Sequence, residues 1–480
     1  MSDPKRLHPI AAIINMLRQL KELIVPILFI TIFGGRGNEG LFYFIAVGGG
    51  LGLVLLSGFL SWYRFTYRVE EGELRIEHGL FVRKKRYIPF ERIQSIDVSE
   101  GILQRPFGLV KVKVETAGGA RTEDAEAVLT AIRKEEANHI HELLVSVKNS
   151  QLGNESSEEE VPIRESIIYK LSPGDLLLLA STSGGVGVVI SAVIAFFFQF
   201  EEIIPYEKLY NEVEHFIANG IFFISIVVFL GFLVAWVISV IMTMLKYANF
   251  TLKKVDQDLI ITRGLLEKRQ ITIPLKRIQA IRISENILRQ PLGMASVYVE
   301  SAGGSALNEE GSKVLVLPLI KKQQIAKTLE PFLEGYPFRT QLNKLPSRAF
   351  SRYLIKGVVL VIPIVIVVSY LFRPWGYASS LLILPSVIWS ALKFKDAGWA
   401  LEKDSLTLRY RTLVKSTVLM RREKVQSLTA RKSFFQNKKR LATIEAVVKS
   451  GHSGSGGCVN DLEDKDVEVI YHWFSRDVHH

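Results

Sequence analysis

The chain has 480 residues, of which 48% are hydrophobic and 22% charged, and its formal net charge is +12 at pH 7. Its mean hydropathy is nevertheless positive, which indicates very apolar stretches separated by polar ones. The single cysteine, Cys458, excludes an internal disulfide and a cysteine-based zinc site. The basic charge suits nucleic acid or an anionic membrane surface, and the apolar stretches favour the membrane.

Six apolar segments are predicted to form three membrane hairpins. A spanning helix needs about 20 apolar residues, and most of the segments approach or exceed that length. The first is only about half a span, and it is either an entry helix that deepens into a short span or a re-entrant piece. The six segments are Leu23–Phe33, Leu41–Trp62, Leu176–Phe200, Ile217–Leu245, Leu354–Phe372 and Tyr377–Leu392.

The charges beside these segments predict their orientation. Lys and Arg gather in the polar flanks, for example at Arg64, Lys246 and Lys393, whereas the hairpin loops are poor in them. By the positive-inside rule, both termini and the long polar segments are cytoplasmic, in a multi-pass protein of the cell membrane. The spans are almost free of ionisable residues. Lys356 and Asp175 lie near span ends, where Lys356 is expected to snorkel.

The polar segments repeat one another. The stretch IPFERIQSIDVSEGILQRPFG at 88–108 returns as IPLKRIQAIRISENILRQPLG at 273–293, an offset of 185 residues. A divergent third copy has EKVQS at 423–427 where the first has ERIQS at 91–95. The repeating unit is therefore a membrane hairpin followed by a cytoplasmic module, used three times.

Each module is predicted to be a β structure that ends in one helix. Apolar and polar residues alternate in LRIEHGLFVRKKRYI, IQSIDV and LVKVKVETAG, as in half-buried strands. Gly79 and Gly264 stand between strand-like runs, where a turn needs positive φ. Helical patterns follow at 133–147, 321–336 and 465–476. We therefore expect an α+β membrane protein in which each two-helix hairpin precedes a pleckstrin-homology (PH)-like antiparallel barrel with a C-terminal helix.

These features divide the chain into seven predicted parts. They are hairpin 1 (1–62), PH-like module 1 (63–150), an acidic linker (151–170), hairpin 2 (171–246), module 2 (247–340), hairpin 3 (341–395) and the divergent module 3 (396–480).

The motif P-x-x-R-I-Q-S, followed by Q-R-P-x-G-L and V-x-V-x-x-A-G-G, resembles the bacterial membrane-associated PH-domain family (bPH_2, DUF304). Three such modules behind hairpins resemble its YdbT-like multi-pass members. The resemblance implies the fold, the membrane location and a smaller companion with one hairpin and one PH unit. It supplies no catalytic residues. The third copy departs from the motif, since Arg421 and Arg422 replace Pro89 and Phe90, and Asn437–Lys438 replaces Arg105–Pro106.

The repeated stretch has two interpretations. In the structural one, Ile93, Ile96 and Val98 fill the barrel while a glutamine satisfies backbone groups near a turn. In the functional one, a basic residue two positions before the glutamine faces an anionic headgroup or a partner domain. The glutamines are Gln94, Gln279 and Gln426, the basic residues are Arg92, Arg277 and Lys424, and the signature also includes Pro106, Pro291, Gly108 and Gly293.

A basic run is a second candidate contact for anionic lipid or a partner. It consists of Arg83, Lys84, Lys85 and Arg86, and its counterpart in the second copy contains Lys268 and Arg269. A cation near an anionic leaflet contributes about 1 kcal/mol. The alternative is a solvated strand face.

The sequence contains no nucleophile beside a base, no metal-ligand spacing and no nucleotide-binding motif. We therefore expect no enzyme activity, cofactor or metal. The favoured function is binding or scaffolding at the inner leaflet with anionic lipids and the smaller companion, without nucleic acid, in defence of the envelope against membrane-active peptides. The alternative is a transporter of lipid or another amphiphile, and an enzyme comes third.

Overall fold

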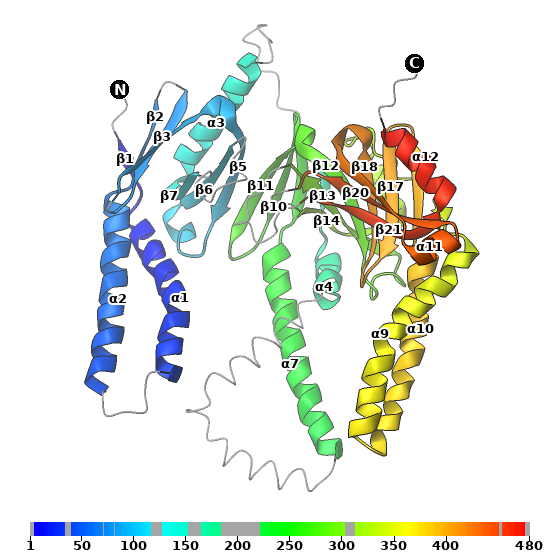
Figure 1. Ribbon diagram of the computed structural model, residues 1–480. Helices are drawn as coiled ribbons and strands as arrows, with labels where there is room; N and C mark the ends of the chain where they lie inside the picture. The colour runs from blue at the N-terminus through cyan, green and yellow to red at the C-terminus, as the bar shows by residue number, and fades with distance from the viewer. Residues whose placement is uncertain are drawn as a thin grey trace. The chain divides into compact units, whose positions relative to one another are not determined.

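The computed structural model describes residues 4–33, 40–70, 72–80, 82–116, 127–151, 165–183, 221–302, 313–450 and 454–475 (Figure 1). The chain divides into two compact units. The first comprises Met1–Glu165 and Val255–Pro274, and the second comprises Ser166–Lys254 and Leu275–His480. The second module is thus divided between the units, because its β10 and β11 belong to the first. The acidic run at 154–160 lies outside the described residues.

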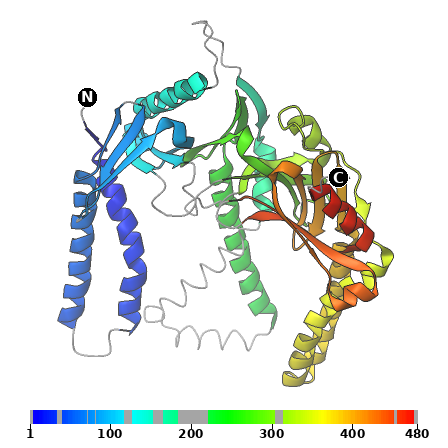
Figure 2. The ribbon, with the colours of Figure 1, turned by 45° about the horizontal axis from the view of Figure 1, so that its top comes forward.

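Unit 1 begins with two helices, α1 (Ile10–Phe33) and α2 (Gly40–Tyr63), which lie side by side (Figure 2). The first predicted segment is therefore part of a longer helix that begins at Ile10. The helices approach closely at Gly58, where an added Cβ would lie 2.7 Å from Met16 Cγ. Ser57 Oγ also donates to Gln19 Oε1 at 2.6 Å.

Module 1 consists of two antiparallel sheets and a helix. The first sheet has the order β1-β2-β3-β4, and β5-β6-β7 form the second. Apolar residues of both sheets, including Leu74, Ile88, Ile93 and Ile96, form one core with Ile140 of the helix. The elements are β1 (Lys5–Arg6), β2 (Thr66–Glu70), β3 (Glu73–His78), β4 (Lys84–Pro89), β5 (Ile93–Glu100), β6 (Leu109–Thr116), β7 (Ala127–Arg133) and α3 (Lys134–Gln151).

Unit 1 also contains two strands of module 2, β10 (Asp258–Arg263) and β11 (Lys268–Pro274). Within this unit the second sheet runs in the order β7-β6-β5-β11-β10. The sheet of one module therefore continues into the next module.

Unit 2 contains the second hairpin region and the rest of module 2. Helices α4 (Pro173–Ser181) and α7 (Ile221–Tyr247) pack against each other. Most of the predicted span Leu176–Phe200 lies outside the described residues. The remaining elements of this region are β8 (Glu165–Lys170), β9 (Thr251–Val255), β12 (Ile278–Glu285), β13 (Met294–Ser301), β14 (Lys313–Lys321) and α8 (Lys322–Leu329).

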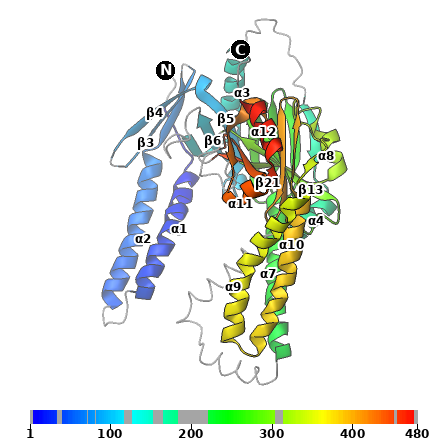
Figure 3. The ribbon, with the colours of Figure 1, turned by 45° about the vertical axis from the view of Figure 1, so that its right-hand side comes forward.

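The third hairpin and module 3 complete unit 2. Helices α9 and α10 lie side by side, and α12 lies along the sheets of module 3 (Figure 3). One sheet has the order β14-β13-β12-β18-β17-β16-β15, and another β19-β20-β21. The elements are β15 (Asn343–Lys344), α9 (Phe350–Leu371), α10 (Ile383–Asp396), β16 (Gly398–Glu402), β17 (Ser405–Arg411), β18 (Lys415–Arg421), β19 (Val425–Arg431), α11 (Phe434–Lys438), β20 (Leu441–Val448), β21 (Ser455–Glu463) and α12 (Asp464–Phe474).

Within the described residues, three helical segments are long and apolar enough to cross a membrane. They are Phe229–Tyr247, Ser347–Leu371 and Gly376–Asp396. A shorter apolar helical segment, Gly48–Tyr63, lies within α2. The predicted antiparallel modules and their closing helices are present in all three copies. The second closing helix is shorter than predicted, because α8 ends at Leu329 and turns follow, with Gly335 at φ +82°.

Candidate functional site

The first joint between modules is the pairing of β5 with β11. The strands are antiparallel, and their register places Glu100 opposite Lys268 and Ser99 opposite Arg269. Beside the ladder, the Thr272 backbone N–H donates to Asp97 Oδ1 at 3.3 Å. Opposite charges facing each other across strands stabilise a sheet. Two of the predicted contact residues, Lys268 and Arg269, therefore lie in a strand that pairs with module 1.

The second joint is the pairing of β12 with β18, which extends from Ala280 opposite Met420 to Glu285 opposite Lys415. The Lys415 ammonium lies 3.4 Å from the Glu285 carboxylate, which also binds Lys322 at 3.1 Å. Burial lowers the pKa of Lys415, while Glu285 and Asp396 act in the opposite direction. The carboxylates therefore hold a cation that burial disfavours.

The two joints use equivalent residues. With the 185-residue offset, Glu100 corresponds to Glu285, the last residue of β5 and of β12. Lys268 and Lys415 correspond as the first residues of β11 and β18. The same acidic and basic positions thus face each other twice. We call β5, β12 and β19 the β5-type strands, and β4, β11 and β18 the β4-type strands. A module joint is the pairing of these two types, with its acidic position on the β5-type strand and its basic position at the start of the β4-type strand.

The series of joints ends at two open edges. Strand β4 is the last strand of the sheet β1-β2-β3-β4, and β19 is the first of β19-β20-β21. Among the described residues, neither has a strand partner on its outer side. The basic position of β4 is Arg83, the residue directly before the strand, which is exposed and binds Glu77. The acidic position of β19 is occupied by a base, Lys432.

The residue at the acidic position also forms an ion pair with the first residue of the closing helix, and in module 3 the two charges of this pair are reversed. In modules 1 and 2 the acidic residue binds the lysine that begins the closing helix, as in the Glu100–Lys134 pair at 2.8 Å. In module 3 the corresponding residues are Lys432 and Asp464, and they form the reversed pair. The local ion pair is kept, but the charge that the edge presents is inverted.

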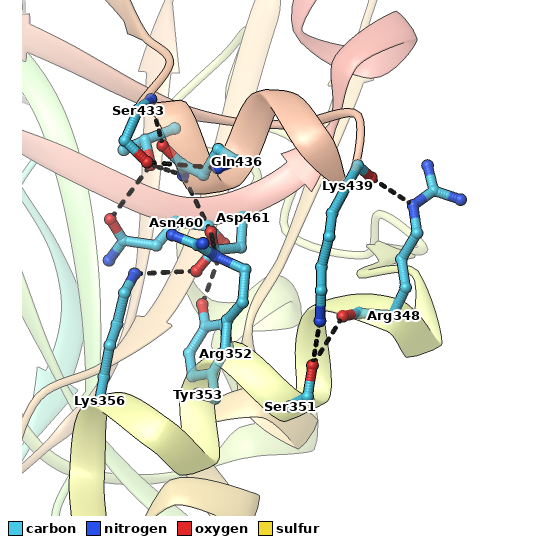
Figure 4. A network of polar contacts seen from close by, with 11 residues as sticks. Arg348, Ser351, Arg352, Tyr353, Lys356, Ser433, Gln436, Lys439, Asn460 and Asp461 are labelled. Carbon is cyan, nitrogen blue, oxygen red and sulfur yellow. Dashed lines mark hydrogen bonds and ion pairs between the residues drawn. The ribbon is translucent and has the colours of Figure 1, made fainter. Parts of the chain in front are cut away.

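A polar network fastens module 3 to α9 (Figure 4). The side chain of Asp461 in β21 is fully buried, and it accepts hydrogen bonds from Arg352 Nε at 2.7 Å and Lys356 Nζ at 2.9 Å. Gln436 Nε2 of α11 donates to it at 2.9 Å. Lys356 is therefore bound by a protein carboxylate, whereas the sequence predicted that it would snorkel. We refer to Arg352, Lys356, Gln436 and Asp461 as the α9 junction.

More exposed contacts surround the α9 junction. Arg348 Nη2 lies 2.8 Å from Glu463, and its Nε donates to the Lys439 carbonyl at 2.9 Å. Lys439 Nζ binds Ser351 Oγ at 2.6 Å, and the Tyr353 hydroxyl donates to the Asn460 carbonyl at 3.0 Å.

Module 2 is fastened to its own hairpin differently. Arg289 is buried, and it donates to Thr182 Oγ1 at 2.8 Å and to the Leu179 carbonyl at 3.3 Å, at the end of α4. It also binds Ser296 Oγ at 2.7 Å. Gln104, Arg289 and Gln436 are equivalent positions of the repeat and all are buried. Gln104 stays within module 1, where its Oε1 accepts from the Gly101 backbone N–H at 2.8 Å.

A cleft of about 690 Å³ lies between the ends of α9 and α10 and the strands of module 3. Lys356, Trp389 and Lys393 line its helical side, and Arg411, Glu445 and Cys458 line its strand side. Arg411 is ion-paired with Asp396 and stacks over Trp389, with its Cζ 5.5 Å from the ring centroid. Burial raises the pKa of the Cys458 thiol, with Glu445 acting in the same direction.

The remaining predicted site residues are placed as follows. Lys84, Lys85 and Arg86 lie on β4, with Lys85 Nζ 3.7 Å from Glu77. Arg92 is exposed. Arg277 Nε donates to the Ala302 carbonyl at 3.0 Å, and Lys424 Nζ lies 3.5 Å from the Lys276 carbonyl. The basic residue of the repeated phrase therefore binds backbone in modules 2 and 3.

The glutamines of the phrase differ between the modules, whereas its two glycines share one backbone conformation. Gln279 is buried and donates to the Arg277 carbonyl at 3.1 Å, whereas Gln426 is exposed. Gly108 and Gly293 both have φ +63°. Gly108 follows a 3₁₀ segment that contains Pro106, and Gly293 lies in a turn that contains the counterpart Pro291. In module 3, Arg440 takes this left-handed position at φ 52°. The side chain of Gln94 lies outside what the structure describes.

Comparisons with known proteins agree with this architecture. The family model described as Bacterial PH domain matches residues 19–148, 203–334 and 353–478. The chain is 38% identical over 488 residues to the UPF0699 transmembrane protein YdbT of Bacillus subtilis (strain 168), covering 99% of both chains. It is 32% identical over 78 residues to the UPF0699 transmembrane protein YdbS of the same strain, covering 16% of this chain and 45% of that protein.

Proposed function

Because the chain belongs to the bacterial PH-domain family, as a transmembrane member with three modules, we propose that it is a non-catalytic scaffold of the cytoplasmic leaflet. In this proposal the hairpins anchor the modules in the cell membrane, and the termini and modules are cytoplasmic. The modules bind anionic lipid headgroups and a smaller family member that has one PH-like module.

The observation that carries the proposal is the way in which successive modules are fastened. Each module joint repeats the same antiparallel register and the same opposition of charges. The α9 junction ties module 3 to its helix through a buried carboxylate. Such contacts hold surfaces in fixed places, which a scaffold requires. In these contacts the ionisable groups bind one another and attach the modules. In an enzyme, such groups would have to be available to the substrate.

We propose the cleft beside α9 and α10 as the binding site for an anionic lipid headgroup. Lys393 in the last turn of α10 is half-buried and lines this cleft together with Trp389. In the proposed orientation these residues lie at the headgroup level, where lysine and tryptophan are enriched. The other cations of the cleft already bind carboxylates, as Lys356 binds Asp461. Lys393 is therefore the residue that we expect to recognise a phosphate.

The test is retention of lipid by the full chain in nanodiscs of equal parts phosphatidylglycerol and phosphatidylcholine. We expect phosphatidylglycerol to be enriched among lipids that remain bound after detergent extraction, as measured by native mass spectrometry. Lys393→Gln should lower that enrichment, whereas the control Lys327→Gln, on the exposed face of α8, should not. Equal retention of both lipids by the wild type would overturn the lipid part of the proposal.

Transport of an amphiphile is the runner-up. In the described parts of the three full-length spans, the charged residues lie near the ends that adjoin the modules, at Lys246, Arg348, Arg352, Lys356, Lys393, Lys395 and Asp396. An ion-coupled path requires ionisable groups deeper in the membrane, so the scaffold is preferred. Protection against membrane-active peptides would follow from a scaffold that organises the leaflet. If a strain that lacks the protein were as sensitive to such peptides as the parent strain, this protective role would be refuted.

A further inference from the structure

The open edge of β4 has the features of half a module joint. Strands β11 and β18 are its counterparts in the repeat, and each pairs with a β5-type strand of the preceding module. Module 1 has no preceding module in the described chain, and among the described residues β4 is paired only with β3. Within the described residues, the receiving strand therefore occurs three times, as β4, β11 and β18, and two of these are paired with a strand of a preceding module.

The charges of β4 match those of the filled joints. Arg83 occupies the position of Lys268 and Lys415, and both of these face a glutamate across the joint. Basic residues on an edge strand often guard against unwanted strand pairing. That explanation does not suit β11 and β18, which carry the same basic position and are paired. In this fold, the basic position marks a strand that accepts an acidic partner.

A second copy of this chain is a poor occupant. Its only open β5-type strand among the described residues is β19, which ends in Arg431 and continues with Lys432. In the register of the joints, Lys432 would face Arg83 and Arg431 would face Lys84. Like charges directly opposite each other destabilise a sheet. The reversed ion pair between Lys432 and Asp464 thus gives β19 the wrong charge for β4.

We propose that the β4 edge receives the β5-type strand of a separate bacterial PH-domain chain, one that has an acidic residue at the position of Glu100 and Glu285. The incoming strand pairs antiparallel with Lys84–Pro89, and its acidic residue faces Arg83. This inference rests on the scaffold proposed above, because it names the surface through which that scaffold holds its smaller family member.

The experiment is site-specific photo-crosslinking of the full-length chain in native membranes. A benzoylphenylalanine replaces Lys85, which in this register faces the residue two positions before the acidic one. The control places the same group at Arg75 of β3, a strand paired on both sides. We expect a protein adduct from position 85 alone, attached within the β5-type strand of another family member. Arg83→Glu should reduce it at least tenfold, and Arg83→Lys should leave it in place.

Several results would overturn the proposal. They are no adduct with another chain, an adduct only with phospholipid, an adduct with β19 of a second copy, or attachment outside the β5-type strand. An adduct that survives Arg83→Glu would also overturn it. Lipid retention at Lys393 does not depend on this edge. A failed crosslink with intact phosphatidylglycerol enrichment therefore rejects the docking edge while the lipid-binding scaffold stands.

Discussion

Replacing Asp461 by Asn should loosen module 3 from α9. The carboxylate is fully buried and holds two cations, at 2.7 Å from Arg352 and 2.9 Å from Lys356. Asn keeps the side-chain shape and tolerates the left-handed φ of 58° at this position, so the substitution isolates the charge.

The structure sets the size of this effect. Removing one partner of a buried ion pair costs about 3–5 kcal/mol. The Lys356 side chain is 53% exposed and can return to water, whereas that of Arg352 is only 14% exposed. We therefore expect the lower end, about 3 kcal/mol. That loss raises the population of the locally open junction by about a hundredfold.

Hydrogen exchange measured by mass spectrometry on the full chain in nanodiscs reads this opening directly. Amides of α11 and β21 should exchange about a hundredfold faster in Asp461→Asn. The matched control is Glu463→Gln, which breaks the exposed Arg348–Glu463 pair and should cost only about 0.2–1 kcal/mol. Adding Arg352→Gln to Asp461→Asn removes the stranded cation and should restore part of the protection. Equal exchange in Asp461→Asn and Glu463→Gln would refute the reasoning.

Three further predictions follow from contacts described above. The triple variant Arg431→Ser/Lys432→Glu/Asp464→Lys gives module 3 the charges of modules 1 and 2 and should make the detergent-solubilised chain associate with further copies of itself. Mass photometry should show the increase in mass, and adding Arg83→Glu should return the mass to that of the wild type. Gly58→Leu should separate α1 from α2, since its Cβ would meet Met16 at 2.7 Å; faster proteolysis of the hairpin than in Gly49→Leu, where nothing lies within 4 Å, checks this. Burial raises the pKa of Cys458, so that less of the reactive thiolate is present at pH 7 than in a free cysteine. The rate of its alkylation by iodoacetamide should therefore be low at pH 7, and it should still increase with pH where a free thiol is already fully ionised. Bound phosphatidylglycerol should slow it further.

The sequence was sufficient for the repeat, the modules and most of the helices, because these depend on local periodicity and on internal identity. The three closing helices and the core positions of Ile93 and Ile96 follow from that pattern. Register between strands far apart in the chain depends on tertiary packing, so the pairing of Glu100 with Lys268 could not be deduced. A signal was nevertheless present, since Glu100 and Glu285 are identical within the repeated phrase while Lys432 differs.

Asp461 had no comparable signal. It occupies the strand position of Ala131 and Leu319, which are buried apolar residues, so repeat comparison predicts a core residue there. Its partners Arg352 and Lys356 read as membrane-flanking cations, and only the fold brings them to a carboxylate about a hundred residues away in sequence. The sequence singled out the basic run at 83–86 as a candidate contact, but its place on an open strand edge was visible only in the structure.

One of the departures of module 3 from the repeat lies at the open edge of β19. If β19 ended in a glutamate, every copy of the chain would carry complementary ends, acidic on β19 and basic on β4. A contact of that head-to-tail kind produces a ring where the rotation closes and an open filament where it does not. The reversal at Lys432 and Asp464 keeps the ion pair that holds the closing helix while removing the complementarity. The exchange of both charges keeps the local pair and changes the charge at the edge, as expected if that charge controls which strands can join.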